Sequence, residues 1–72
     1  MEQELRQRIA LNIKIERVKK SLTQEKLAEL AEISTKHITK IEKASVTPSI
    51  YLIYKISKVL DVTIDTLTNR VV

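Results

Sequence analysis

The residues with the clearest capacity for chemistry lie in the middle of the chain, between Ile33 and Leu60. This stretch contains five lysines and a single acidic residue, Glu42. Its first part is a short run rich in hydroxyl, imidazole and ammonium groups, namely Thr35, Lys36, His37, Thr39 and Lys40. Such groups bind phosphates and the edges of bases, so this chemistry suits a polyanionic partner. The alternative is an ordinary solvated surface, on which scattered lysines are common.

The composition excludes several other chemistries. The 72 residues include no Cys and no Gly, and they contain one His. Without Cys there is no disulfide, no thiolate nucleophile and no Cys-ligated metal, and one His cannot form the usual zinc site. Without Gly there is no loop of the kind that cradles phosphates in nucleotide enzymes. We therefore expect no cofactor, no metal site and no enzymatic activity.

Length and hydropathy indicate one soluble domain over residues 1–72. A chain of this size builds a single small core. No apolar run approaches the ~18 residues of a membrane helix, and the N-terminal MEQELRQR is not followed by the apolar segment of a signal peptide. The formal net charge is +4. We expect a cytoplasmic protein with no membrane association.

Helical spacing of apolar residues predicts the elements that position the central polar run. The first helix runs from about Glu4 to Lys20, with Leu5, Ile9 and Ile13 on one face and a second stripe, Leu11, Ile15 and Val18, on another. Four further helices are expected at about 24–32, 35–43 and 50–60 and directly after Thr63, and Leu67 is expected to face inward on the last of them. No segment alternates with period two, so the prediction is an all-α fold of five helices.

The helix ends carry their own signals. Thr23, Ser34, Ser49 and Thr63 precede the four later helices, and each is a good N-cap residue. Ser21, Glu32 and Asp61 follow helices at positions where glycine is the usual choice. We expect local backbone strain at these three ends, since the chain has no Gly.

Two of the predicted helices form a helix-turn-helix. Thr23–Ala31 is the first helix, Glu32-Ile33-Ser34 the turn and Thr35–Lys43 the second helix. In such a pair the N-terminal part of the second helix enters the DNA major groove. The central polar run occupies that helix, with Ile38 and Ile41 predicted beneath it.

These residues resemble those of a known family. Leu22–Ala28 and Ile33–Glu42 are similar to the signature of Cro/CI-type (Xre-family) helix-turn-helix regulators, and the similarity continues through Pro48–Ile50 to Leu67. It covers roughly residues 9–68. The resemblance implies a lambda-repressor-like five-helix domain that binds double-stranded DNA. It is greatest to small restriction–modification controller proteins and short phage-type repressors. The family often has Gly where this chain has Ser21, Glu32 and Ala44.

The resemblance also implies roles for individual residues. Gln24 contacts a phosphate and braces the recognition helix, Thr35, Lys36 and Thr39 read bases, and Lys40 reads a base or holds a phosphate. Ser34 caps the helix beside a phosphate, while Lys14, Lys43 and the loop 44–46 follow the DNA backbone. For His37 a phosphate contact and a half-buried position between helices are equal alternatives. Arg17 and Glu42 are expected to form a structural ion pair.

Relatives of this size commonly pair through their fourth and fifth helices, so we expect a homodimer on a near-palindromic operator. The expected contacts are Tyr51, Leu52, Val59 and Leu67, with Tyr54 near them and Val71 and Val72 at the apolar chain end. The alternative is that these are scattered surface apolar residues. Activation would require contact with RNA polymerase, for which Glu25 or Glu29 could serve. The main alternative is a protein-interaction module, such as an antitoxin or adaptor, that docks through Leu11, Ile15 and Val18.

Overall fold

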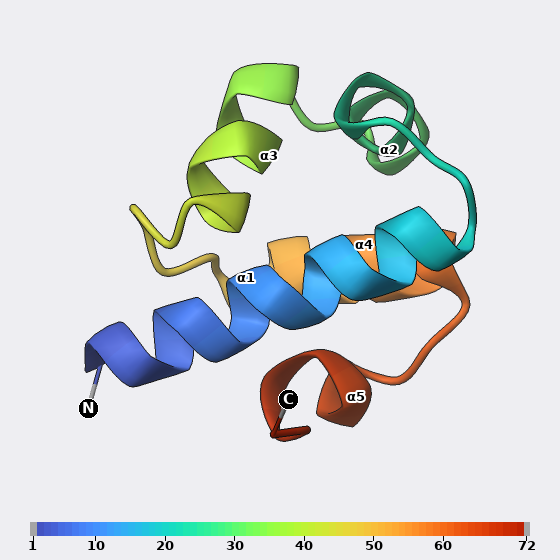
Figure 1. Cartoon of the computed structure of the whole chain (residues 1–72). Helices are drawn as coiled ribbons and strands as arrows, with labels where there is room; N and C mark the ends of the chain where they lie inside the picture. The colour runs from blue at the N-terminus through green and yellow to red at the C-terminus, as the bar shows by residue number, and fades with distance from the viewer. Residues whose placement is uncertain (1, 72) are drawn as a thin grey trace.

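The computed structural model describes residues 2–71, which form five helices and no strand. The helices are α1 (Glu2–Lys19), α2 (Gln24–Ala31), α3 (Thr35–Glu42), α4 (Ile50–Leu60) and α5 (Ile64–Thr68). In Figure 1, α1 crosses the front of the molecule with α4 behind it, while α2 and α3 lie above and α5 below. The predicted all-α, five-helix fold is confirmed. None of the described helices is long and apolar enough to cross a membrane.

Each of the four later helices begins at the predicted N-cap. The hydroxyl of Thr23 accepts a hydrogen bond from the backbone N–H of Lys26, and that of Ser34 accepts from His37. The hydroxyls of Ser49 and Thr63 accept from the N–H groups three residues further on. Each bond satisfies one of the backbone donors that a helix start leaves without a partner.

The helix ends show the strain expected from the absence of glycine. Ser21, Glu32 and Asp61 have φ angles of 58°, 57° and 56°, and Ala44 has 59°. These values lie in the left-handed region, where a Cβ atom crowds the following carbonyl. At Glu32 the backbone N–H nevertheless bonds to the carbonyls of Ala28 and Glu29, so the conformation closes the end of α2.

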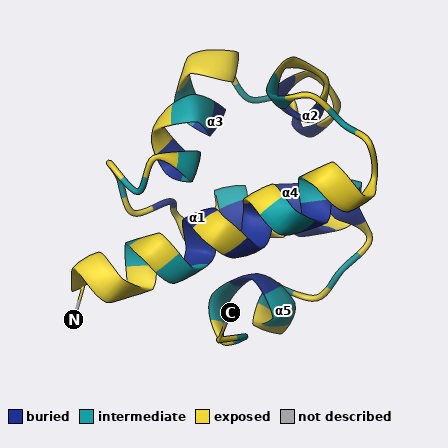
Figure 2. Ribbon diagram, viewed as in Figure 1, coloured by how far each residue is buried: buried dark blue, intermediate teal, exposed yellow. Residues whose placement is uncertain are grey.

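The core is built from the inward faces of all five helices and consists of Ile9, Ile13, Leu27, Ala28, Ile38, Ile41, Ile53, Ile56, Leu60 and Leu67. Only part of the predicted α1 stripe reaches it. Ile9 and Ile13 are buried, whereas Leu5 is 38% exposed. Figure 2 shows the reason: the first turns of α1 extend past the other helices and are largely exposed. On the second stripe Leu11 and Val18 are exposed and Ile15 is half-buried.

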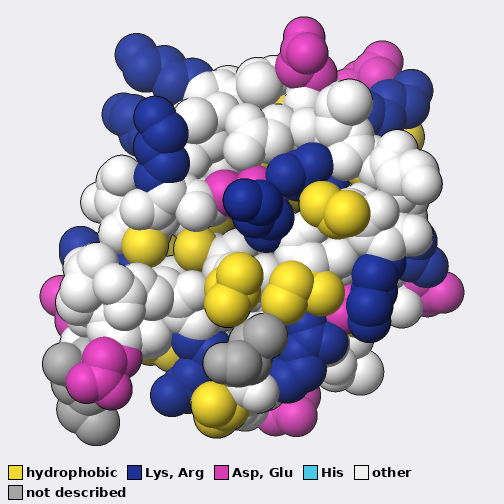
Figure 3. Space-filling view, in the orientation of Figure 1, with side chains coloured by type: hydrophobic (Ala, Val, Ile, Leu, Met, Phe, Trp, Pro, Cys, Tyr) yellow, Lys and Arg dark blue, Asp and Glu magenta, His cyan; other side chains and the backbone are white. Residues whose placement is uncertain are grey.

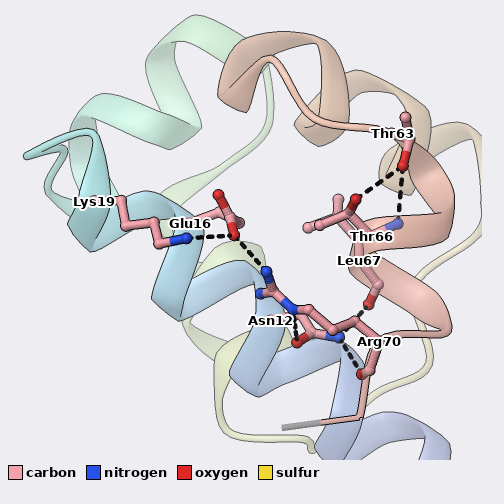
Figure 4. Close-up of polar contacts among 7 residues, drawn as sticks. All are labelled: Asn12, Glu16, Lys19, Thr63, Thr66, Leu67 and Arg70. Atoms are coloured by element: carbon pink, nitrogen blue, oxygen red, sulfur yellow. Dashed lines mark hydrogen bonds and ion pairs between the residues drawn. The ribbon is translucent and has the colours of Figure 1, made fainter.

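Two buried polar residues of α1 hold the end of the chain. Asn12 donates from Nδ2 to the carbonyls of Leu67 (3.1 Å) and Arg70 (3.0 Å), and its Oδ1 accepts from Arg70 Nε (3.1 Å). Arg70 Nη1 lies 2.7 Å from Glu16 Oε2, which Lys19 Nζ also approaches at 3.4 Å (Figure 4). The hydrogen bond from Arg70 and the nearby charge of Lys19 lower the pKa of Glu16, although burial opposes this shift.

The structure corrects part of the predicted dimer contact. Leu67 is fully buried in the core, so its side chain offers no surface to a second copy. Tyr51 is 65% exposed, whereas Leu52 and Val59 are half-buried and lie about a quarter-turn away on α4. The four residues therefore do not form one surface. Val71 is exposed, and Val72 lies outside the described residues.

Candidate nucleic-acid interface

The central lysines project from one face of α3. Ile38 and Ile41, on the opposite side of the helix, are 0% and 1% exposed and anchor α3 to the core. Lys36, Lys40 and Lys43 are exposed. In Figure 3 basic side chains gather at the upper left, over α3, and acidic side chains lie at the top, over α2. The packing of the two isoleucines thus fixes which side of α3 presents positive charge.

The predicted reading residues at the start of α3 lie beside these lysines. Ser34 and Thr35 are exposed, and the Ser34 hydroxyl is engaged in capping the helix through the N–H of His37 (3.1 Å). His37 is half-buried. A shallow hollow of about 250 Å³ lies between this flank of α3 and the following loop, lined by Ser34, Lys36, His37, Lys40 and Val46.

A polar network fixes α3 against α1 and α2. Arg17 donates from Nε to Glu42 Oε2 (2.7 Å), from Nη2 to Glu42 Oε1 (3.0 Å) and from Nη1 to the carbonyl of Leu22 (2.7 Å). The side chains of Arg17 and Glu42 are only 12% and 4% exposed. A bidentate ion pair that is so little exposed to solvent fixes the position of α3 relative to α1, because both charged groups are satisfied only in this arrangement.

Gln24 extends this network to the recognition surface. Its Nε2 donates to Glu42 Oε1 (3.0 Å), and its Oε1 accepts from the hydroxyl of Thr39 (2.8 Å). The Thr39 hydroxyl also lies 3.1 Å from the carbonyl of Thr35. Gln24 therefore spans α2 and α3 in the free protein and keeps one amide hydrogen for a further acceptor. Thr39 presents its methyl group and an accepting oxygen, since its single proton is already used.

The two remaining predicted phosphate contacts lie outside α3 itself. Lys14 is exposed on α1, and Lys43 is exposed at the end of α3, where the loop to α4 begins. Within residues 2–71 no group of three or more His, Cys, Asp or Glu side chains is placed to hold a metal ion.

Sequence reasoning missed the polar cluster of Asn12, Glu16 and Arg70. A signal was present, because Asn12 and Glu16 are four residues apart and share the helix face that carries Ile9 and Ile13. Polar residues in such positions are buried only when partners satisfy them. The partners come from the chain end, 54 to 58 residues away, and only the folded chain reveals them.

Comparison with known proteins agrees with this architecture. A solved HTH_3-family transcriptional regulator from Vibrio cholerae superposes with a TM-score of 0.88 at 22% identity, over 93% of this chain. A solved hypothetical transcription factor, NHTF, from Neisseria gives the same TM-score at 28% identity over 94% of this chain. The present chain spans 38% of the first protein and 78% of the second. No curated protein matches it.

The match to the family profile covers most of the described fold. It extends over residues 13–67, which include the helix-turn-helix of α2 and α3, all of α4 and most of α5. The first eleven residues of α1 precede the match. With its sequence matched over this length and its five helices in place, the chain belongs to the HTH_3 helix-turn-helix family.

Proposed function

We propose that the protein binds double-stranded DNA sequence-specifically as a homodimer and regulates transcription from a near-palindromic operator. The observation that carries this proposal is the face of α3, where Lys36, Lys40 and Lys43 are exposed while Arg17, Gln24 and Glu42 hold the helix from behind. Family membership supports the same conclusion, and both solved relatives are described as transcription factors or regulators.

The proposed mechanism divides affinity from specificity. Lys14, Lys43, Ser34 and the amide of Gln24 contact phosphates and set the register of the protein on DNA. Lys36 and Thr35 read base edges in the major groove, where lysine donates to guanine O6 and N7. Thr39 offers its methyl group to a thymine methyl. Lys40 and His37, which line the hollow beside α3, hold the backbone on that flank.

Within the family, we propose a small repressor or controller that acts by occupying its operator near a promoter. Contact with RNA polymerase through Glu25 or Glu29 is the corresponding proposal for activation. Both residues are exposed on α2, on the side of the helix away from the buried Leu27. A cytoplasmic location follows from the same role.

Selection from a random duplex library tests the proposal. With purified protein at about 150 mM salt, where non-specific binding is weakened, we expect recovery of a palindrome. Its half-sites should lie about one helical turn apart, because a twofold dimer places its recognition helices about 34 Å apart. A single unpaired half-site would support DNA binding and refute the dimer. Recovery of no sequence above background would refute the DNA-binding proposal.

One observation favours a second function. Leu11 and Val18 are 44% and 58% exposed on α1. Apolar surface of this kind suits a protein partner. An antitoxin or adaptor that uses this stripe would yield no enriched duplex, and its partner binding would be lost on changing Leu11 to Ser.

A further inference from the structure

Two exposed surfaces of this chain are not explained by its own packing. The first is the α1 overhang, residues 2–8, which projects past the other helices (Figure 1). Leu5 on the overhang is 38% exposed. It borders a groove of about 640 Å³ lined by Glu2, Glu4, Leu5, Arg8 and Thr47. The overhang precedes residues 13–67, over which the family profile matches.

The second surface is the outward face of α4. Ile50, Tyr51 and Tyr54 are 67%, 65% and 47% exposed, and helical geometry places them together with Lys58 on one side of the helix. The opposite side is buried in the core. Three large apolar side chains on one solvent-facing turn are unusual for a helix whose packing face is already complete.

Charge makes the two surfaces complementary. The sequence of α4, IYLIYKISKVL, contains two lysines and no acid, whereas the overhang carries Glu2 and Glu4. The Lys58 ammonium lies 5.3 Å from the Tyr54 ring centroid, so positive charge borders the exposed aromatic surface. Among residues 2–71, Glu4 and Lys58 form no ion pair with each other or with any other group.

The basic residues of the overhang do not oppose this match. Arg6 donates to Thr47 Oγ1 (2.7 Å) and pairs with Glu2 (3.3 Å), so its charge is already engaged within the chain. Arg8 lines the groove beside Leu5, and a guanidinium stacks favourably on tyrosine rings. The overhang therefore offers an apolar side chain, a free carboxylate and a stacking group to a surface of aromatic rings and lysines.

We propose that the α1 overhang of one copy docks on the outward α4 face of a second copy, and that the exchange is reciprocal. This inference rests on the proposed homodimer and names its contact. Each chain carries both complementary surfaces, so a twofold axis makes the same contact twice and leaves neither surface exposed. Leu5 then packs on Tyr51 and Tyr54 of the partner, and Glu4 meets Lys58.

Sedimentation equilibrium without DNA tests this contact separately from DNA binding. Leu5→Asp should raise the dimer Kd by roughly 30-fold or more, since it places a charge in the centre of the interface. Glu4→Lys should raise it about tenfold, because two repelling pairs are created in each dimer. Combining Glu4→Lys with Lys58→Glu in one chain restores opposite charges at both contacts and should return the Kd to within about threefold of wild type.

The control is Glu25→Lys, which makes the same change of charge on α2 and should leave the Kd unchanged. Circular dichroism verifies that each variant is folded, as expected for exposed positions. A wild-type protein that stays monomeric would overturn the inference, and so would a dimer that tolerates Leu5→Asp and Glu4→Lys. Oligomers that keep growing with concentration would overturn the proposed twofold dimer. DNA selection with the same preparations reports independently on the proposed function.

Discussion

At the residue scale, the lysines of α3 and the buried groups behind them have different physical roles. Lys36 is exposed to solvent, whereas Glu42 is nearly excluded from solvent and bound by Arg17 and Gln24. If the proposed interface is correct, the exposed ammonium gains a partner only when DNA binds. The buried carboxylate already has its partners, and its contribution is to keep Gln24 and α3 in one position before DNA binds.

Lys36→Ala tests the reading role. If Lys36 contacts a guanine, the change should cost about 1–3 kcal/mol on the selected operator and relax the preference at one base pair. Random duplexes should be affected much less. Binding titrations on operator and random DNA provide the measurement. Equal weakening of both would instead identify Lys36 as a phosphate contact.

Glu16 makes stability depend on pH. Its folded-state pKa is lowered, chiefly by the hydrogen bond from Arg70. A lowered pKa means that the stabilisation is fully present above the ordinary value of a glutamate and is lost as the pH falls through the folded-state value. Thermal unfolding from about pH 6 to about pH 3 should therefore show a falling Tm.

The variant Glu16→Gln isolates this contribution. It should be less stable than wild type near neutral pH and should lose less further stability in acid. Glu25→Gln, at an exposed carboxylate on α2, is the matched control and should follow the wild-type curve. A Glu16→Gln curve parallel to that of wild type would show that the ion pair with Arg70 does not contribute to folding.

At the scale of elements, the turn of the helix-turn-helix depends on how α2 ends and how α3 begins. Ser34 starts α3 with a side-chain cap, and Glu32 ends α2 at a φ of 57°. The cap is favourable, whereas the left-handed conformation at a residue with a Cβ is costly. The tight turn between α2 and α3 is therefore maintained by the packing of Leu27, Ala28, Ile38 and Ile41 rather than by its own preference.

Glu32→Gly should stabilise the protein, because glycine adopts this conformation without the Cβ clash. We expect a gain of about 1 kcal/mol, or about 4–8 °C in Tm for a domain of this size. The control is Glu29→Gly, three residues earlier in the body of α2, where the same replacement should cost about 1 kcal/mol. Thermal denaturation of both variants decides the matter. A lower Tm for Glu32→Gly would show that the Glu32 side chain has a stabilising role outweighing the backbone strain.

At the scale of the whole molecule, the fold exposes three lysines on or beside α3 and leaves apolar side chains exposed on α1 and α4. The formal charge of +4 is modest, so its effect on a polyanionic partner depends on which basic residues reach phosphate. Neutralising phosphates releases counterions, so affinity for any duplex should fall steeply with salt. The number of lysines that reach phosphate sets the slope.

The variants Lys14→Ala and Lys43→Ala test whether these two lysines contact phosphate. Each should weaken binding to operator and random duplexes alike and reduce the slope of log K against log salt by about one. Titrations between about 50 and about 200 mM salt give the slope. Lys19→Ala is the control, because Lys19 lies near the buried Glu16 instead of on the α3 surface. An unchanged slope in either variant would remove that lysine from the interface.

The sequence by itself determined the elements of this protein. Apolar spacing of three and four residues and the hydroxyl caps at Thr23, Ser34, Ser49 and Thr63 are local signals, and the helices they predict are present. Backbone strain at Ser21, Glu32 and Asp61 was also predictable, because helix ends commonly need a positive φ and the chain has no glycine to adopt it. The order and spacing of α2 and α3 were likewise sufficient to predict the helix-turn-helix.

Only the tertiary structure decided which surfaces remain free. Leu5 repeats the spacing of Ile9 and Ile13 yet is exposed, because no other helix reaches the first turns of α1. Leu67 faces inward as predicted but is so fully buried that it leaves no surface for a dimer contact, and Asn12 and Glu16 are buried in contact with Arg70. Burial depends on contacts between residues far apart in the chain, and the periodicity of one helix does not contain that information.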